Sequence, residues 1–332
     1  MEVSRKYFQS FCEMRDSCIR RRGESDMENN RFAVISDSSC DLPDELTAAK
    51  EITVVPFYVS FDGETYKKEG TEIGIREFYR EMVEQPGVYP KSSMPSIQDY
   101  VDVFQPFAQA HIPVLCICIT TKFSGSMQSA LNAREMVLSQ YEDAQIEVID
   151  ATVNTVLQGL FVLEAVSMRE EGMTLSEAVA ALDEIKESGR IFFTIGSMDY
   201  LQHGGRIGKV AGAAASVLGI RPIITLKQGE IFPSGISRSR RKSIDKVIAL
   251  LLDYLKENGR PMSSYRFTIG FGYDREEAVL FKEQVLAALR TGGYEMEDAW
   301  INQIGATIAV HTGPYPLGIG IIRRHKKERQ GE

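Results

Sequence analysis

Apolar segments in the first half of the chain alternate between strand-length runs and helix-length stretches. Residues 31–37 and 113–119 are short apolar runs, which are typical of strands buried in a parallel sheet. Ile75, Phe78 and Met82 recur at helical spacing, so we expect a helix over residues 75–83. Further strands are expected at 52–59 and 146–150, and further helices after residues 43, 96, 126 and 174 and in a long apolar stretch that ends near 172. Such alternation predicts an open, mostly parallel, doubly wound α/β sheet over residues 31–189.

The pattern changes in the second half. A strand at 191–195 is followed by a glycine-rich stretch at 201–208 and by a hairpin signal around residues 227–229. Helices are expected near 244–255 and after 274, and strands at 266–271, 295–301 and 317–322. Residues 190–325 are therefore predicted to form a smaller α+β domain. His311 follows the apolar stretch 304–310 and is expected at the edge of a loop.

Both ends of the chain differ from the part between them. Residues 1–30 hold six basic and six acidic residues without apolar periodicity, so we expect a poorly ordered polar extension. Residues 326–332 are expected to be a basic tail. The total of 332 residues fits two domains at roughly 150 residues each.

Composition excludes several classes of protein. The formal net charge of −8 and the pI near 5.3 argue against broad nucleic-acid binding, which usually needs a basic face. No apolar run approaches the roughly 18 residues of a membrane span. The five cysteines form no CxxC pair, and no apolar signal segment opens the chain, so reduced thiols and a cytoplasmic location are expected.

The familiar catalytic motifs are missing from the sequence. No G-x-G-x-x-G follows a predicted strand, the stretch 204–209 lacks phosphate-loop spacing, and neither G-x-S-x-G nor H-E-x-x-H occurs. The four histidines are too scattered for a metal-site signature. We therefore expect no cofactor and no metal.

Three loops that follow or connect the predicted elements are rich in hydroxyl groups. They span residues 37–39, 91–96 and 121–130. In a parallel sheet such loops gather at the carboxyl ends of the strands, where ligands bind. The last two also begin helices, whose free N–H groups favour a carboxylate or a phosphate. Helix capping alone explains one such loop, but the repetition indicates an anion-binding site.

The order of the motifs resembles the DegV family of bacterial fatty-acid-binding proteins. The resemblance extends from about Phe32 to Ile322. It rests on the segments Ser36–Pro43, Val55-Pro56, Asp62-Gly63, Lys91–Ser96, Ser124–Ala130, Val148–Asp150, Asp199–Ile207 and His311–Pro314.

This resemblance implies a non-enzymatic carrier that holds one long-chain fatty acid, such as palmitate or oleate, in a tunnel between two domains. In the characterised branch, the acid is presented to a separate fatty acid kinase that makes acyl phosphate. The matching head-group contacts are Ser92 and Ser124, with His311 close by and with Ser93 and Ser126 as secondary contacts. Arg238 matches an arginine of the kinase step, whereas Asp37, Gly204, Gly205 and Arg206 belong to structural motifs.

The sequence departs from the family at the head-group loops. Ser92-Ser93-Met94-Pro95 replaces the usual Thr-Ser-Gln-Pro, and Ser126-Met127 replaces Thr-Tyr. Tyr315 stands where the family has glycine. These changes affect the expected head-group geometry and chain-length preference.

Two other hypotheses remain open at this point. The chain could be a hydrolase or phosphotransferase acting on a small anionic metabolite at the same serine loops, with His311 or Asp37 as general base. It could also be a docking module that uses the basic residues of Arg238–Lys242. The apolar helix at 156–168 is either a tunnel wall or ordinary core.

Overall fold

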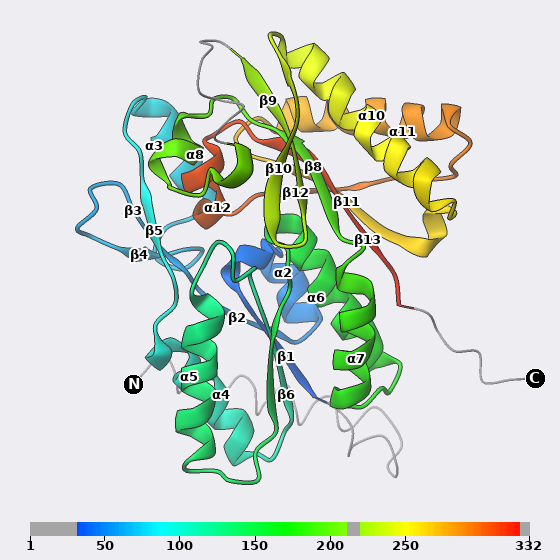
Figure 1. Cartoon of the computed structure of the whole chain (residues 1–332). Coiled ribbons are helices and arrows are strands. Elements are labelled where there is room, and N and C mark those ends of the chain that lie inside the picture. Colours follow the sequence, from blue (N-terminus) through cyan, green and yellow to red (C-terminus); the bar gives the residue numbers. More distant parts are fainter. Residues whose placement is uncertain (1–31, 211–219, 326–332) are drawn as a thin grey trace, which may run out of the picture.

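The computed structural model describes residues 32–210 and 220–325 (Figure 1). The expected polar extension at 1–30 and the expected basic tail at 326–332 lie outside the described residues. The first half contains a four-stranded parallel sheet with the order β2-β1-β6-β7. Its strands are β1 (Ala33–Asp37), β2 (Ile52–Val55), β6 (Val114–Cys118) and β7 (Ile146–Asp150).

Helices cover both faces of this sheet, which confirms the doubly wound prediction. Alternate strand residues supply the two faces: Ile35 packs with α4 (Ile97–Gln109) and α5 (Ser126–Leu138). Val34 packs with α6 (Thr155–Glu170) and α7 (Leu175–Lys186). The chain direction across the sheet reverses between β1 and β6, and the crevice at such a point is where open α/β sheets bind ligands.

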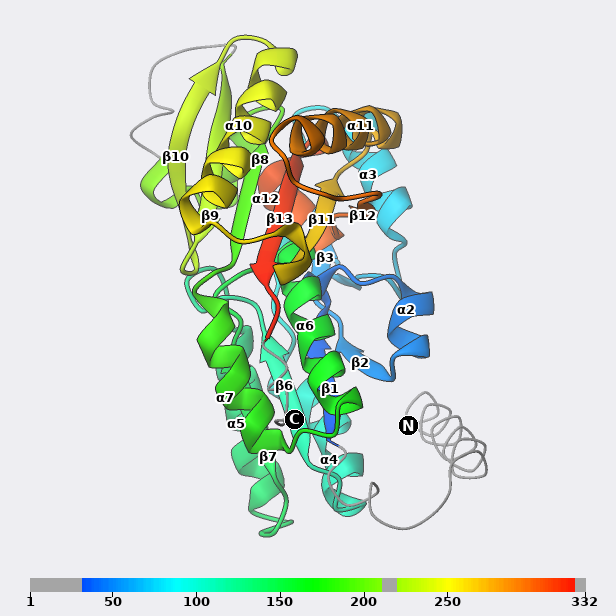
Figure 2. The ribbon, with the colours of Figure 1, turned by 90° about the vertical axis from the view of Figure 1, so that its right-hand side faces the viewer.

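The second half is built on a six-stranded mixed sheet with the order β10-β9-β8-β13-β11-β12. All neighbouring strands are antiparallel except β11 and β12. The strands are β8 (Arg190–Thr194), β9 (Arg221–Lys227), β10 (Glu230–Ser237), β11 (Tyr265–Phe271), β12 (Trp300–Gln303) and β13 (Leu317–Arg323). One face is covered by α10 (Arg240–Asn258) and α11 (Arg275–Thr291), on the outer side in Figure 2.

A third, small antiparallel sheet was not expected. It has the order β4-β3-β5 and consists of β3 (Tyr58–Ser60), β4 (Lys67–Lys68) and β5 (Lys91–Ser93). The single strand expected over 52–59 is therefore wrong. The segment divides at Pro56 into strands of two different sheets, since proline cannot donate to a ladder. Residues 91–93 were expected in a loop but pair with β3.

Three further helices pack beside this small sheet. They are α3 (Ile75–Glu84), α8 (Asp199–His203) and α12 (Ala306–Thr312), which share an apolar cluster with Val59 of β3. A short helix, α2 (Asp44–Ala49), follows β1 through the 3-10 turn at Ser38–Cys40. The strand expected at 295–301 begins only at Trp300.

The helix α6 connects the two halves of the molecule. Its apolar residues share one core with Leu115 of the parallel sheet and with Leu226 and Ile322 of the six-stranded sheet. The structure thus has a two-domain α/β fold in which one apolar core spans both sheets. The domain boundary predicted at residue 189/190 stays a prediction. Within residues 32–210 and 220–325, no helix has the length and apolar character needed to cross a membrane.

Candidate functional site

A cavity of about 260 Å³ lies between the two domains. From the first domain it is lined by the small sheet and by the loops that follow β6 and β7. From the second domain it is lined by apolar side chains of the six-stranded sheet, including Ile191, Phe193, Leu226 and Leu317. The expected tunnel wall at 156–168 contributes only its first residue, Val156, while the apolar side chains from Leu157 to Met168 are packed into the core.

The structure brings together most of the residues predicted for the head group. Ser92, Ser93, Ser124 and His311 all line the cavity, although they come from three separate segments. Ser92 lies on β5, and its Oγ is 3.3 Å from Nε2 of His311. His311 lies in the last turn of α12, next to the loop that follows Thr312, in agreement with the expected position at the edge of a loop. One end of the cavity therefore carries two kinds of hydrogen-bonding group, hydroxyl and imidazole.

His311 is held in its neutral form. Burial, followed by the charge of Arg206, lowers the pKa of this imidazole to about 4. Its Nδ1 is buried without a hydrogen-bond partner. Gly204 packs directly against the ring, and a Cβ at this position would collide with Nδ1. The glycine of the Gly-Gly-Arg motif is thus required by the position of the histidine.

Arg206 connects the two domains beside this end of the cavity. Its Nε donates to the carbonyl oxygen of Phe123 at 3.2 Å, and its Nη1 donates to that of Gly204 at 2.9 Å. Arg206 also lines the cavity, although it is exposed. The preceding Gly205 has φ +66, a conformation that glycine adopts without strain.

Ser126 lies away from the cavity, contrary to the secondary ligand contact expected for it. Its side chain is fully buried, and its Oγ donates to Oδ2 of Asp37 at 2.8 Å and contacts the hydroxyl of Tyr100 at 2.7 Å. Asp37 also accepts from Ser39, from Gln158 and from the backbone of Ile119. The Asp37 carboxylate therefore joins β1, the loop after β6 and α6 behind the site.

Burial raises the pKa of Asp37, and these donors oppose that rise. The arrangement agrees with the structural role expected for Asp37.

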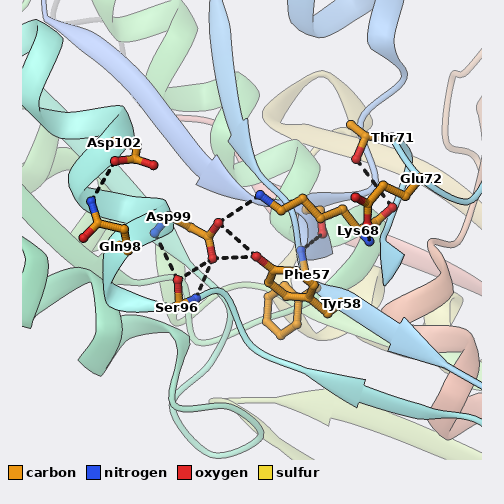
Figure 3. A network of polar contacts seen from close by, with 10 residues as sticks. Phe57, Tyr58, Lys68, Thr71, Glu72, Ser96, Gln98, Asp99 and Asp102 are labelled. Atoms are coloured by element: carbon orange, nitrogen blue, oxygen red, sulfur yellow. Dashed lines mark hydrogen bonds and ion pairs between the residues drawn. The ribbon is translucent and has the colours of Figure 1, made fainter. Parts of the chain in front are cut away.

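A second polar network fixes the strand that carries Ser92 (Figure 3). Asp99, at the start of α4, accepts from the Tyr58 hydroxyl at 2.9 Å, from Lys68 Nζ at 3.0 Å and from Ser96 Oγ at 2.6 Å. Partial burial raises the pKa of Asp99, but the hydrogen bonds from Ser96 and Lys68 outweigh it and lower the pKa below its usual value. The network ties the small sheet to α4, so the loop between Ser92 and Ser96 is held at both ends.

Two buried acids behind the cavity wall were not singled out from the sequence. Thr155 and Thr307 line the cavity, and their hydroxyls donate to Asp41 at 2.5 Å and to Glu69 at 2.6 Å. Burial raises the pKa of Asp41 well above its usual value, and the nearby Glu69 raises it further. Burial also raises the pKa of Glu69. The only sequence signal for this pair was the position of Asp41 within the Ser36–Pro43 motif.

Arg238 is exposed at the end of β10 and does not line the cavity. The basic cluster around it is smaller than the sequence suggests, because Arg240 forms a bidentate ion pair with Glu277 at 2.6 and 2.7 Å. Within residues 32–210 and 220–325, no three acidic, histidine or cysteine side chains converge in a way that could hold a metal ion.

Comparison with known proteins identifies one family. Residues 31–324 match a family model described as "Uncharacterised protein, DegV family". A DegV domain-containing protein of Caldanaerobacter subterraneus is 32% identical over 289 residues, which covers 87% of this chain and 98% of the relative.

Solved structures show the same architecture. A protein of Eubacterium ventriosum described as a stearic acid-binding protein is 45% identical, covers 88% of this chain and 98% of its own, and has a TM-score of 0.84. A DegV family protein of Thermus thermophilus, described by its fatty acid binding, is 28% identical over 88% of this chain and 99% of its own, with a TM-score of 0.78. The fatty acid binding protein DegV of Bacillus subtilis is 26% identical over 89% of this chain and 100% of its own, with a TM-score of 0.76.

Proposed function

We propose that this chain, which belongs to the DegV family, binds one long-chain fatty acid in the cavity between its two domains. The observation that carries the proposal is the cavity itself, which is apolar along the six-stranded sheet and lined at one end by Ser92, Ser124 and His311. The stearic acid-binding protein at 45% identity supports the ligand class.

In this proposal the carboxylate lies against the serine and histidine side chains. Removing a carboxylate from water costs several kcal/mol unless it is well hydrogen-bonded. The hydroxyls of Ser92 and Ser124 each offer one donor, and the neutral imidazole of His311 offers one N–H. Hydrogen bonds to a charged group are stronger than neutral ones, so three donors offset much of that cost. The exposed Arg206 adds a positive charge beside the same end.

The acyl chain supplies most of the affinity. Each buried methylene contributes about 0.8 kcal/mol, so the roughly fourteen methylenes of palmitate contribute about 11 kcal/mol. Association costs several kcal/mol of this. The remainder corresponds to sub-micromolar binding, and the head group fixes the orientation of the ligand.

We further propose that the bound acid is presented to a separate fatty acid kinase. The support is the family resemblance at Arg238, which is exposed and therefore accessible to a partner. Co-incubation with a kinase of this type, ATP and fatty acid should yield acyl phosphate, and Arg238→Glu should slow its formation without weakening fatty-acid binding. Equal rates for both forms would refute the role of Arg238.

The enzyme hypothesis has no specific observation in its favour. It needs a general base at Ser124. His311 contacts Ser92 instead, and Asp37 is fully buried against Ser126.

Native mass spectrometry of freshly purified protein tests the main proposal directly. We expect a bound mass equal to one long-chain fatty acid, and a rise in melting temperature when stripped protein receives stearate or oleate. Ser92→Ala should weaken stearate binding about tenfold, since one charge-assisted hydrogen bond is lost. Ser176→Ala makes the same change on the exposed surface of α7 and should have no effect. Absence of both the bound mass and the thermal shift would refute fatty-acid binding.

A further inference from the structure

Asn154 is a buried polar side chain that the head-group model leaves unused. It lies at the N-cap of α6, lines the cavity and is 9% exposed. Asparagine is a preferred N-cap residue because its side chain accepts from the first-turn N–H groups. Here the side chain makes no capping hydrogen bond, and its Oδ1 has no partner at all. A buried carbonyl oxygen without a hydrogen-bond partner is unfavourable, and a donor on a ligand would satisfy it.

The backbone next to Asn154 is strained. Thr155 has φ +49, which is a genuine outlier for a β-branched residue and is energetically unfavourable. The Thr155 hydroxyl is held by Asp41 at 2.5 Å, so a buried side chain stabilises the unusual conformation. Such strain is characteristic of binding sites. Because Asn154, Thr155 and Val156 all line the cavity, the N-terminal turn of the 16-residue helix α6 opens onto it.

This polar point is distinct from the head-group end. Asp41, which binds Thr155, and Glu69, which binds Thr307, both approach Gly305 at the start of α12. His311 lies six residues further along the chain, at about 1.5 Å of rise per helical residue, or roughly 9 Å away. Thr155 and Val156, which follow Asn154, therefore lie by the start of α12, whereas His311 lies in its last turn, and we assign Asn154 to the region of the acyl chain.

We propose that Asn154 and the first turn of α6 recognise an oxygen substituent on the middle of the acyl chain, so that oxygenated long-chain fatty acids are the preferred ligands. This inference rests on the fatty-acid-binding function proposed above. A hydroxyl at this position can donate to Oδ1 and also accept from an N–H group. A plain methylene leaves the amide of Asn154 unsatisfied.

A ligand series on the unmodified full chain tests the inference without any variant. Stripped protein is titrated with stearate and with hydroxystearates that carry the hydroxyl beside the carboxylate, at mid-chain, or near the methyl end. We expect the mid-chain isomer to bind roughly three- to tenfold more tightly than stearate, the net value of one buried hydrogen bond. The isomer hydroxylated beside the carboxylate should show no such gain. Stearate binding as tightly as every hydroxystearate would overturn the inference while leaving the proposed function intact, whereas failure of all four acids to bind would overturn both.

A matched pair of variants assigns the preference to Asn154. Asn154→Leu keeps the size of the side chain but removes its amide, so stearate should now bind at least as tightly as the mid-chain isomer. Ile308→Leu alters an apolar side chain of the same cavity and should leave the ratio of the two affinities unchanged. An unchanged ratio in Asn154→Leu, with stearate still bound, would also overturn the inference. Binding of stearate by each variant serves as its folding control.

Discussion

The two sides of the cavity are built in opposite ways. The first-domain side consists largely of loops at the carboxyl ends of parallel strands, and it carries the oxygen and nitrogen atoms of Ser92, Ser124 and Asn154. The second-domain side is largely one face of a sheet, whose backbone groups are already paired with neighbouring strands. This face presents apolar side chains such as Phe193 and Leu226.

The difference follows from the geometry of strands. Successive side chains of a strand point to opposite faces, so in β8 Phe192 packs under α10 and α11 while Ile191 and Phe193 line the cavity. A loop has no such constraint and can aim polar groups inward. In the proposed complex, apolar area and head-group orientation come from different elements, and His311 and Arg206 of the second domain join the serines of the first at the head group. In this proposal the sheet face provides the area for the acyl chain, whereas β5, the loop after β6 and α12 fix where the carboxylate oxygens lie.

Placing a charged side chain on the sheet face should lower stearate affinity more than any other substitution proposed for this cavity. Phe193 is only half-buried, so Phe193→Glu leaves the protein folded but brings an unpaired carboxylate against the acyl chain. We expect stearate affinity to fall on the order of 100-fold, because burying an unpaired polar group costs several kcal/mol. Phe193→Leu keeps the surface apolar and should change affinity little. Displacement of a fluorescent fatty acid measures both, and near-normal affinity in Phe193→Glu would show that the sheet is not the acyl wall.

Two serines that lie two residues apart, Ser124 and Ser126, test the roles of the side chains on the loop side of the cavity. Ser126→Ala removes a donor from the buried Asp37 and should lower the free energy of unfolding by about 1–3 kcal/mol, with little change in stearate affinity. Ser124→Ala should do the opposite: about tenfold weaker binding and a smaller loss of stability, about 0.5–1 kcal/mol, because its Oγ accepts only the N–H of Ser126 at the start of α5. Urea unfolding and stearate titration of both variants separate the two roles. Equal loss of stability in the two variants would contradict the division between a structural serine and a ligand-binding serine.

Local signals predicted the regular part of the fold well. The helices expected after residues 96 and 174 both form and begin with capping boxes at Ser96 and Thr174, and the apolar run 113–119 contains the buried strand β6. These features depend on neighbouring residues, so the sequence displays them directly. The strands of the small sheet have two or three residues each, and β3 pairs both with the nearby β4 and with β5, which lies more than 30 residues further along the chain. Strands this short show no hydrophobic periodicity from which their pairing could be predicted. The helix α12 is buried on almost every side, so it lacks the amphipathic period that marks a helix.

The candidate site was predicted only in part, and through family motifs rather than through periodicity. Ser92 and His311 are 219 residues apart, so their contact is visible only in the folded chain. Ser126 shares the hydroxyl chemistry of Ser124 but faces the core, a difference that spacing alone does not reveal. Asn154 was not singled out from the sequence. Its missing cap bond and unpartnered oxygen depend on the strained turn at Thr155.

The smallest predicted effect concerns the protonation of the His311 imidazole at the head-group end. In the empty cavity, burial and then Arg206 hold the pKa of His311 at about 4, against a usual value of 6.5. A fatty-acid carboxylate beside Nε2 favours the charged imidazolium, so binding should raise this pKa. Between the free and the bound pKa the complex then takes up a proton, and affinity should increase as pH falls through the bound value toward 4.

The folding stability of the empty protein should change with pH in the opposite direction to the affinity. The lowered pKa contributes stability above pH 6.5, and this is lost as pH falls toward 4. Proton NMR of the imidazole, assigned with His311→Gln and followed with and without stearate, measures the shift. A pKa that stays near 4 in the complex would place the carboxylate away from His311 and leave orientation to the serine hydroxyls.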